Sequence, residues 1–220
     1  MQGATDICKA VAYWLNYKNL TGLEGLFSEA SLTVPIAEYL RAEKIGALRA
    51  EVNHPAFLQM KGRPRQLDFV GIRENEQWMF AIETKYFPTT IQQIVNDIGR
   101  LLVLNKPSCG KFLILAGPTG KDRSNSFRID VKANGRHRNA TARFFDYKRG
   151  GVKAIKLAEE PPKIQTLFAT FLKDYKINSI PNAFEIACVD FYRSKRFSVG
   201  IWKIKARQGT GQTSIEKLIG

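Results

Sequence analysis

The chain has 220 residues, 44% of them hydrophobic, which is enough for one substantial core. No run of about 18 apolar residues is present, so the composition argues against a membrane-spanning helix. Lys and Arg number 34 against 20 Asp and Glu, and the resulting net charge of +14 indicates a polyanionic partner. Nucleic acid is the first candidate and an anionic membrane surface the second, while a basic protein without such a partner remains an alternative.

The cysteines and histidines restrict the metal and redox chemistry. Cys8, Cys109 and Cys188 are odd in number, far apart and in no CxxC pair, which is typical of reduced thiols in a cytoplasmic protein. His54 and His137 are the only histidines, which disfavours a zinc site or a histidine-based nuclease site. The first 20 residues lack a basic start followed by an apolar stretch, so we expect no secretory signal.

The first 43 residues predict helices. Residues 6–20 carry apolar side chains at helical spacing. A second helical stretch covers roughly residues 23–43, but Pro35 lies inside it. Thr33 could cap a fresh start with Pro35 near its first turn. We therefore expect either a kinked helix or two abutting helices in this stretch.

The next segment predicts strands around one helix. Residues 48–52 alternate between apolar and polar, and residues 67–72 and 78–87 form a hairpin around a charged turn. Residues 90–104 place apolar side chains along one helical face. The run Lys111–Ala116 is continuously apolar, as in a strand buried on both sides. From about residue 23 to 116 the order of elements is therefore α-β-β-β-α-β.

The remaining residues, 117–220, predict a basic α/β elaboration. Between Lys121 and Lys156, eleven Lys and Arg stand against three Asp. Candidate elements are strands at 127–131 and 142–147, a helix at 161–176, and a second hairpin at 185–193 and 197–206.

No composition break or Ser/Gly-rich linker divides the chain, so we expect one domain over residues 1–220. Its predicted fold class is α/β: a central mixed sheet with the 66–86 hairpin at its centre and helices on both faces.

Charged residues within the first hairpin are the strongest functional signal. Side chains alternate along a strand, so Glu83 and Lys85 share one face of an otherwise apolar strand. Buried charges need partners, and Asp68 on the preceding strand can approach Glu83 if the hairpin pairs simply. Two neighbouring carboxylates repel unless a cation lies between them, and oxygen ligands suit Mg²⁺ or Mn²⁺. The alternative is a structural Asp/Glu–Lys cluster at a sheet edge.

These residues resemble the PD-(D/E)xK nuclease superfamily, which shares the restriction-endonuclease-like fold. The resemblance lies in Gln66–Ile72 (QLDFVGI) and Ala81–Tyr86 (AIETKY), with fourteen residues between Asp68 and Glu83. The α-β-β-β-α-β order also looks like the core of that family. Leu67 stands where the nominal motif has proline, a position that varies in the family.

The resemblance implies a site and a cofactor. Asp68, Glu83 and the Thr84 carbonyl would bind Mg²⁺ or Mn²⁺, and Lys85 would position a water or stabilise charge on a phosphate. Residues 28–40 are similar to a helix motif, E-x-x-L-x-x-P, at the start of many members, which would bring Glu29 to the metal site. There Glu29 would bind a second metal or orient the site; otherwise it is an exposed helix carboxylate.

One branch of the superfamily is excluded. Related exonucleases carry Q-x-x-x-Y on the next helix, whereas Gln93 is followed by Asp97 and Gln92 by Asn96 at that spacing. Gln92, Gln93, Asn96 and Arg100 either line the site or form a solvated helix face.

Basic residues in the C-terminal half are candidates for nucleic-acid contacts, because Lys and Arg bind phosphates. The candidates are Arg123, Arg128, Lys132, Arg136, Arg138 and Arg143. Ordinary solvated loops and strand faces are the alternative.

The sequence thus predicts a metal-dependent nuclease, with DNA favoured over RNA and endonuclease over exonuclease. Restriction, phage defence or mobile-element biology would suit the resemblance, and a homodimer is compatible with it. No membrane partner is expected. The alternatives are a non-catalytic nucleic-acid-binding protein on a nuclease-like scaffold, and a subunit whose basic surface meets an acidic protein.

Overall fold

Two neighbouring strands of one mixed sheet run in the same direction. In the computed structural model, β3 (Trp78–Tyr86) and β4 (Gly110–Pro118) pair in parallel, with Glu83 opposite Leu113 and Lys85 opposite Leu115. The structure describes residues 3–23, 27–43, 46–57, 66–106, 108–119, 130–133, 136–139 and 144–219. Because β4 is covered on both faces, it needs no polar face, as its continuous apolar run predicts.

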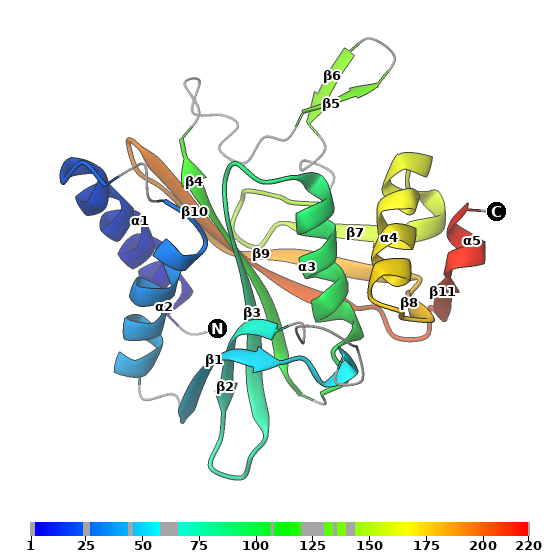
Figure 1. Ribbon diagram of the computed structural model, residues 1–220, viewed down its shortest axis with the longest axis horizontal. Coiled ribbons are helices and arrows are strands. Elements are labelled where there is room, and N and C mark those ends of the chain that lie inside the picture. The colour runs from blue at the N-terminus through cyan, green and yellow to red at the C-terminus, as the bar shows by residue number, and fades with distance from the viewer. Residues whose placement is uncertain are drawn as a thin grey trace.

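Five further strands extend this pair to a seven-stranded sheet (Figure 1). Every neighbouring pair except β3 and β4 is antiparallel. The strand order is β1 (Ala47–Asn53), β2 (Gln66–Ile72), β3, β4, β10 (Phe197–Ala206), β9 (Ala183–Arg193) and β7 (Val152–Lys156). The predicted C-terminal hairpin therefore joins the same sheet as the N-terminal strands, and β4 is its middle strand rather than the 66–86 hairpin.

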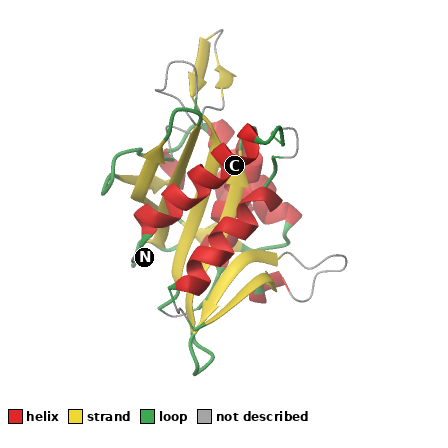
Figure 2. Ribbon diagram, turned by 90° about the vertical axis from the view of Figure 1, so that its left-hand side faces the viewer, coloured by secondary structure: helices red, strands yellow, loops and turns green. Residues whose placement is uncertain are grey.

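Helices cover both faces, which confirms the predicted α/β class. Helices α1 (Ala4–Leu20) and α2 (Ala30–Ala42) lie on one side (Figure 2). Helices α3 (Ile91–Val103) and α4 (Pro162–Asp174) lie on the other. None of the helices in the described part of the chain is long and apolar enough to cross a membrane.

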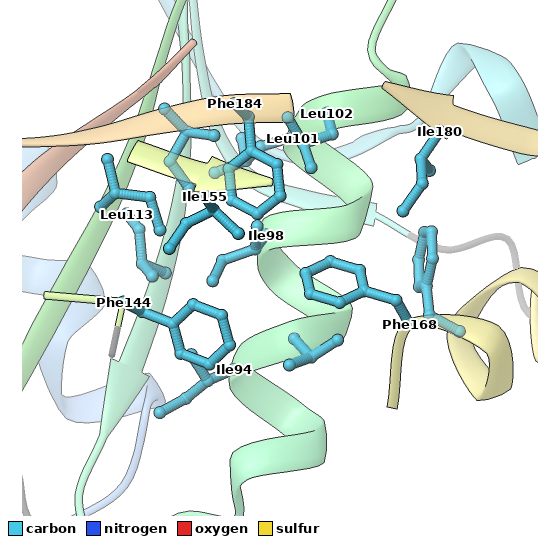
Figure 3. Packing of buried hydrophobic residues seen from close by; sticks show 14 of the residues in the cluster. Ile94, Ile98, Leu101, Leu102, Leu113, Phe144, Ile155, Phe168, Ile180 and Phe184 are labelled. Carbon is cyan, nitrogen blue, oxygen red and sulfur yellow. The ribbon is translucent and has the colours of Figure 1, made fainter. Parts of the chain in front are cut away.

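The larger core lies on the α3 and α4 side. The apolar stripe of α3 contributes Ile94, Ile98 and Leu101, which pack near Leu113 of β4 and Phe168 of α4 (Figure 3). Gly99 brings α4 close, because a Cβ there would lie 2.6 Å from the Phe171 ring. Helix α3 is therefore firmly held in place where it faces β3.

Of the two alternatives for residues 23–43, the pair of abutting helices is wrong. A single helix begins at Ala30 and continues through Pro35, and Thr33 is an exposed residue inside it rather than a cap. Pro35 removes one backbone donor, but it is buried beside Ile36 in the face that packs against α1. Burial of the apolar face therefore outweighs the local preference for a break.

The segment between β4 and β7 also differs from the prediction. A separate two-stranded hairpin comprises β5 (Asp130–Ala133) and β6 (Arg136–Asn139). Residues 144–147, expected in a strand, are not in one; Phe144 and Phe145 are buried in the larger core instead. Aromatic side chains that interrupt a basic stretch serve here to anchor it to the core.

Several short elements were not predicted. These are β8 (Ser179–Pro181), β11 (Gln212–Ser214), α5 (Ile215–Ile219) and the 3-10 turns Pro55–Phe57 and Leu157–Glu159.

Candidate active site

The alternation of β3 sorts its side chains onto the two faces of the sheet. Phe80, Ile82 and Tyr86 enter the core beneath α1 and α2. Glu83 and Lys85 point to the opposite face, where their charged groups meet side chains of α3. Their exposed fractions are only 0% and 7%. The predicted shared face is confirmed, and both charges need partners because they are buried.

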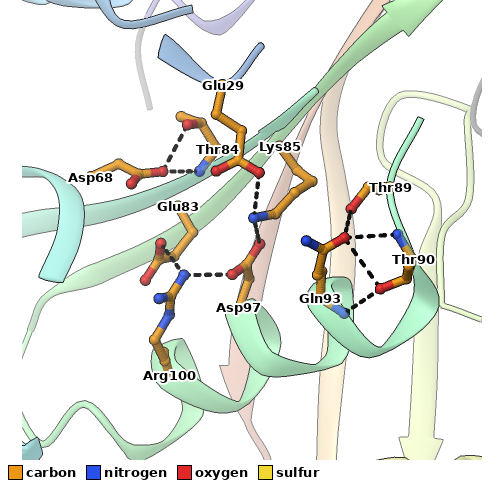
Figure 4. A network of polar contacts seen from close by, with 10 residues as sticks. All are labelled: Glu29, Asp68, Glu83, Thr84, Lys85, Thr89, Thr90, Gln93, Asp97 and Arg100. Carbon is orange, nitrogen blue, oxygen red and sulfur yellow. Dashed lines mark hydrogen bonds and ion pairs between the residues drawn. The ribbon is translucent and has the colours of Figure 1, made fainter. Parts of the chain in front are cut away.

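Asp68 is held across the hairpin by the residue between Glu83 and Lys85. One carboxylate oxygen of Asp68 accepts hydrogen bonds from the Thr84 backbone N–H at 2.6 Å and the Thr84 hydroxyl at 2.7 Å (Figure 4). The charge of Asp68 also contributes to raising the pKa of Glu83, so the two carboxylates influence each other. Strands β2 and β3 thus bring together the predicted aspartate and glutamate.

Helix α3 supplies two charged groups that complete this cluster. Arg100 Nη2 donates to Glu83 Oε2 at 2.8 Å and to Asp97 Oδ1 at 2.5 Å. The other oxygen of Asp97 lies 3.2 Å from Lys85 Nζ. Asp97 therefore bridges the arginine and the lysine, and one carboxylate joins both cations of the site.

Glu29 reaches the same lysine from the start of α2. Its Oε1 lies 2.7 Å from Lys85 Nζ, and its side chain is 47% exposed. The amine of Lys85 is thus held between Glu29 and Asp97 (Figure 4). The structure therefore brings Glu29 to Lys85.

Burial and mutual repulsion raise the pKa of the inner carboxyls. Burial raises the pKa of Glu83 well above its ordinary range, against the attraction of Arg100. Burial likewise raises the pKa of Asp97 to about 6, although Arg100 and Lys85 oppose this. Both shifts arise chiefly from burial, which disfavours the charged carboxylate, and only in part from neighbouring carboxylates.

The pKa values of the two cations are also raised, which for a base favours the charged form. Burial alone would lower the pKa of Lys85, but the charge of Asp97 and the hydrogen bond with Glu29 outweigh it, so the pKa is raised. For Arg100 burial is likewise outweighed by Glu83 and Asp97. Both side chains therefore stay protonated at neutral pH.

His54 supports the cluster from behind α3. Its Nδ1 accepts from the Ala56 N–H at 3.1 Å, which leaves Nε2 to donate to the Arg100 carbonyl at 2.9 Å. Burial lowers the pKa of His54 to about 4, so the ring is neutral at pH 7. This neutral ring fixes the backbone of the residue that binds Glu83.

Asp97 is the site residue that sequence reasoning missed, whereas Arg100 was among the residues expected either to line the site or to form a solvated helix face. Asp97 follows Ile94 by three residues and precedes Leu101 by four, so it lies on the apolar, buried face of α3. A carboxylate at such a position requires a cation, and Arg100 is one helical turn away. A carboxylate on the apolar face of a predicted helix, with an arginine three residues later, was therefore the sequence signal for a buried ion pair.

The other polar residues of α3 have different roles. Gln93 forms a capping box with Thr90 at the start of the helix. Gln92 donates to Asn96 and to the Leu167 carbonyl of α4. Of Gln92, Gln93, Asn96 and Arg100, Arg100 alone contacts the candidate catalytic side chains.

The predicted nucleic-acid contacts fall on the β5–β6 hairpin or beyond the described residues. Lys132, Arg136 and Arg138 belong to β5 and β6, which project from the end of the sheet where β3 and β4 end (Figure 1). Arg123, Arg128 and Arg143 lie outside the residues that the structure describes.

Comparisons of the chain with protein-family models, with curated proteins and with solved structures each returned no match. Within the described residues, no group of three or more His, Cys, Asp and Glu side chains is arranged as a metal site. Function must therefore be argued from the charged cluster itself, which contains Asp68, Glu83, Lys85, Asp97 and Arg100, with Glu29 at its edge.

Proposed function

We propose that this protein is a divalent-metal-dependent nuclease that hydrolyses phosphodiester bonds, with DNA as substrate and internal cleavage as the mode. Lys85 carries the proposal. It is a buried, protonated amine held between Glu29 and Asp97, two residues from a buried glutamate and across a hairpin from Asp68. Buried ionic clusters stabilise a fold poorly compared with apolar packing, so their presence favours a functional role.

The order of elements supports the same proposal. Helix α2, strands β1, β2 and β3, helix α3 and strand β4 follow one another as in the α-β-β-β-α-β core of PD-(D/E)xK nucleases. Asp68 comes from β2, Glu83 and Lys85 from β3, and Glu29 from the start of α2, as the resemblance implies. We propose that the sheet is an elaborated restriction-endonuclease-like fold.

The cluster fits a small divalent cation. Glu83 Oε1 is buried and has no hydrogen-bond partner among the described residues, a state that is unfavourable for a carboxylate oxygen. Asp68 also has one oxygen that accepts no hydrogen bond from a described residue. Carboxylate oxygens are the ligands that Mg²⁺ and Mn²⁺ prefer. Asp68 and Glu83, with the Thr84 carbonyl, would hold the ion.

The protein groups around the ion divide the remaining work. A bound divalent cation supplies Lewis acidity and lowers the pKa of a water. The Lys85 amine can hold the attacking water or stabilise charge on the phosphate, because it is protonated and fixed. Glu29 and Asp97 orient that amine, and Arg100 keeps the Glu83 carboxylate in place.

The basic hairpin offers a route to the substrate. Strands β5 and β6 carry Lys132, Arg136 and Arg138 and project from the sheet end at which β3 finishes. Lys and Arg at such a position would bind phosphates and make affinity depend on salt. We propose that these contacts hold the nucleic-acid backbone on either side of the cleaved bond.

Cleavage assays test the proposal directly. Supercoiled plasmid, linear duplex and single strands are incubated with Mg²⁺, Mn²⁺ or EDTA. Wild-type protein is expected to cut with metal only, and Glu83→Gln and Lys85→Met to lose cutting by at least about 100-fold, the effect of removing one electrostatic group from an active site. Both variants should keep nucleic-acid binding, measured by fluorescence anisotropy at several salt concentrations.

Matched controls come from the same sheet. Lys203 is an exposed lysine of β10, and Glu185 of β9 forms an ion pair with Arg207. Lys203→Met and Glu185→Gln should therefore leave cutting unchanged. Salt-sensitive binding without cutting in any metal would favour the non-catalytic scaffold. Cutting that survives both site substitutions would place the active site elsewhere.

A further inference from the structure

The cluster contains more carboxylates than one cation needs. Four carboxylates, those of Asp68, Glu83, Asp97 and Glu29, surround Lys85 and Arg100, and Figure 4 shows their arrangement. Such a set could in principle hold two divalent cations, because paired metal sites share carboxylates. The contacts of each oxygen decide how many ions the site can accept.

The place between Glu83 and Asp97 is already taken. One Nη atom of Arg100 lies 2.8 Å from Glu83 Oε2 and 2.5 Å from Asp97 Oδ1, so a single positive group bridges two carboxylates as a metal ion would. The second oxygen of Asp97 and Oε1 of Glu29 both face Lys85. Asp97 Oδ2 makes no hydrogen bond among the described residues, but it lies 3.2 Å from the Lys85 ammonium, so a cation already faces each oxygen of Asp97.

Two further carboxylate oxygens, one on Glu83 and one on Asp68, have no cation recorded beside them among the described residues. Glu83 Oε1 is buried without a hydrogen-bond partner among the described residues, and Asp68 keeps one oxygen outside its bonds to Thr84. These two carboxylates come from neighbouring strands. They offer one place for a cation, next to the arginine rather than in its position.

Charge balance leads to the same number. With every group ionised, four carboxylates against Lys85 and Arg100 leave a formal charge of −2 in a largely buried site. One divalent cation neutralises this charge, whereas a second would leave the cluster positive and buried, which is unfavourable.

We infer that the site takes one divalent cation, and that the Arg100 guanidinium holds the place of a second between Glu83 and Asp97. This inference rests on the proposed function, because it concerns the cation of that site. Asp97 and Arg100 are then positioning residues that do not bind the metal. Asp97 holds the Lys85 amine and the Arg100 guanidinium next to each other. Glu29 then orients Lys85 instead of binding a second ion.

The test is a count of bound Mn²⁺. EDTA-stripped full-length protein is titrated with Mn²⁺, and the free ion is measured by electron paramagnetic resonance. Wild type is expected to bind one ion, Asp97→Asn still one, and Glu83→Gln none. Arg100→Met frees Glu83 Oε2 and Asp97 Oδ1 and is expected to bind two, whereas Arg100→Lys and the exposed-surface control Arg193→Met should bind one.

Each other count has a definite meaning. Two ions in wild type falling to one in Asp97→Asn would overturn the inference by making Asp97 a ligand, and cleavage with intact metal dependence would leave the nuclease proposal standing. One ion in folded Arg100→Met would overturn the role given to Arg100. No ion in wild type would overturn the cation site itself. The counts for wild type and Asp97→Asn decide the question even if Arg100→Met does not fold.

Discussion

The two faces of β3 are built from the same strand but in opposite ways. On one face, Phe80, Ile82 and Tyr86 pack into the core beneath α1 and α2. On the other, Glu83 and Lys85 are equally buried but are matched by Asp97 and Arg100 of α3. Both sets of side chains are buried, yet only the first gains free energy from its burial without a large desolvation penalty.

The difference shows where the fold accepts a cost in stability. Apolar residues at 83, 85, 97 and 100 would extend the core that Ile94, Ile98 and Leu101 already form on α3. Replacing a buried ion network by well-packed apolar residues is often neutral or stabilising. Under the proposed function, the charged face of β3 serves chemistry and the apolar face serves packing.

The largest expected effect comes from breaking the charged face at its bridge. Asp97→Ala leaves Lys85 and Arg100 each short of a partner and should lower the free energy of unfolding by about 3–5 kcal/mol. Asp97→Asn still accepts from Arg100 and should lose less, about 1–3 kcal/mol. Urea denaturation measures both, and equal losses in the two variants would contradict the bridging role.

Metal should stabilise the charged face alone. At a free Mn²⁺ concentration about 100-fold above the dissociation constant, ligand binding adds about 2.7 kcal/mol to the unfolding free energy. Wild type and Ile82→Val should gain this increment, and Glu83→Gln should not. Thermal unfolding with Mn²⁺ and with EDTA makes the comparison, and a gain in Glu83→Gln would move the cation away from Glu83.

A pH dependence should arise from the ring behind the charged face. The pKa of His54 is lowered to about 4 from its ordinary 6.5, so the unfolded chain binds the proton first. Its contribution to stability is fully present above pH 6.5 and is lost as pH falls towards 4, by roughly 2 kcal/mol between pH 6.5 and 5. Urea denaturation should show this loss in wild type and a smaller one in His54→Asn; identical slopes would exclude His54 as the cause.

The smallest effect is expected on the apolar face. Ile82→Val removes one methylene from a fully buried side chain and should cost about 1 kcal/mol of unfolding free energy. Because Ile82 points away from α3, cleavage and Mn²⁺ binding should not change. A loss of cleavage in a variant that remains folded would show that the two faces are coupled.

Local patterns determined most of the regular structure. The period-two alternation of residues 78–86, the continuous apolar run at 111–116 and the helical stripe of 91–103 each correspond to an observed element. They also placed Glu83 and Lys85 on one face, because alternation in a strand needs no knowledge of the rest of the chain. The proposed roles of Asp68, Glu83, Lys85 and Glu29 came from short motifs and remain predictions.

Only the tertiary structure decided which charges meet. Asp97 and Arg100 lie on the same helix, but their partners Glu83 and Lys85 are on a strand, and pairing across elements depends on how α3 packs on the sheet. The same holds for β9 and β10, which join the sheet at β4 rather than form a separate unit. It also holds for Phe144 and Phe145, which are buried in the core instead of forming the expected strand. Such outcomes depend on the free energy of burying distant segments together, which no local pattern records.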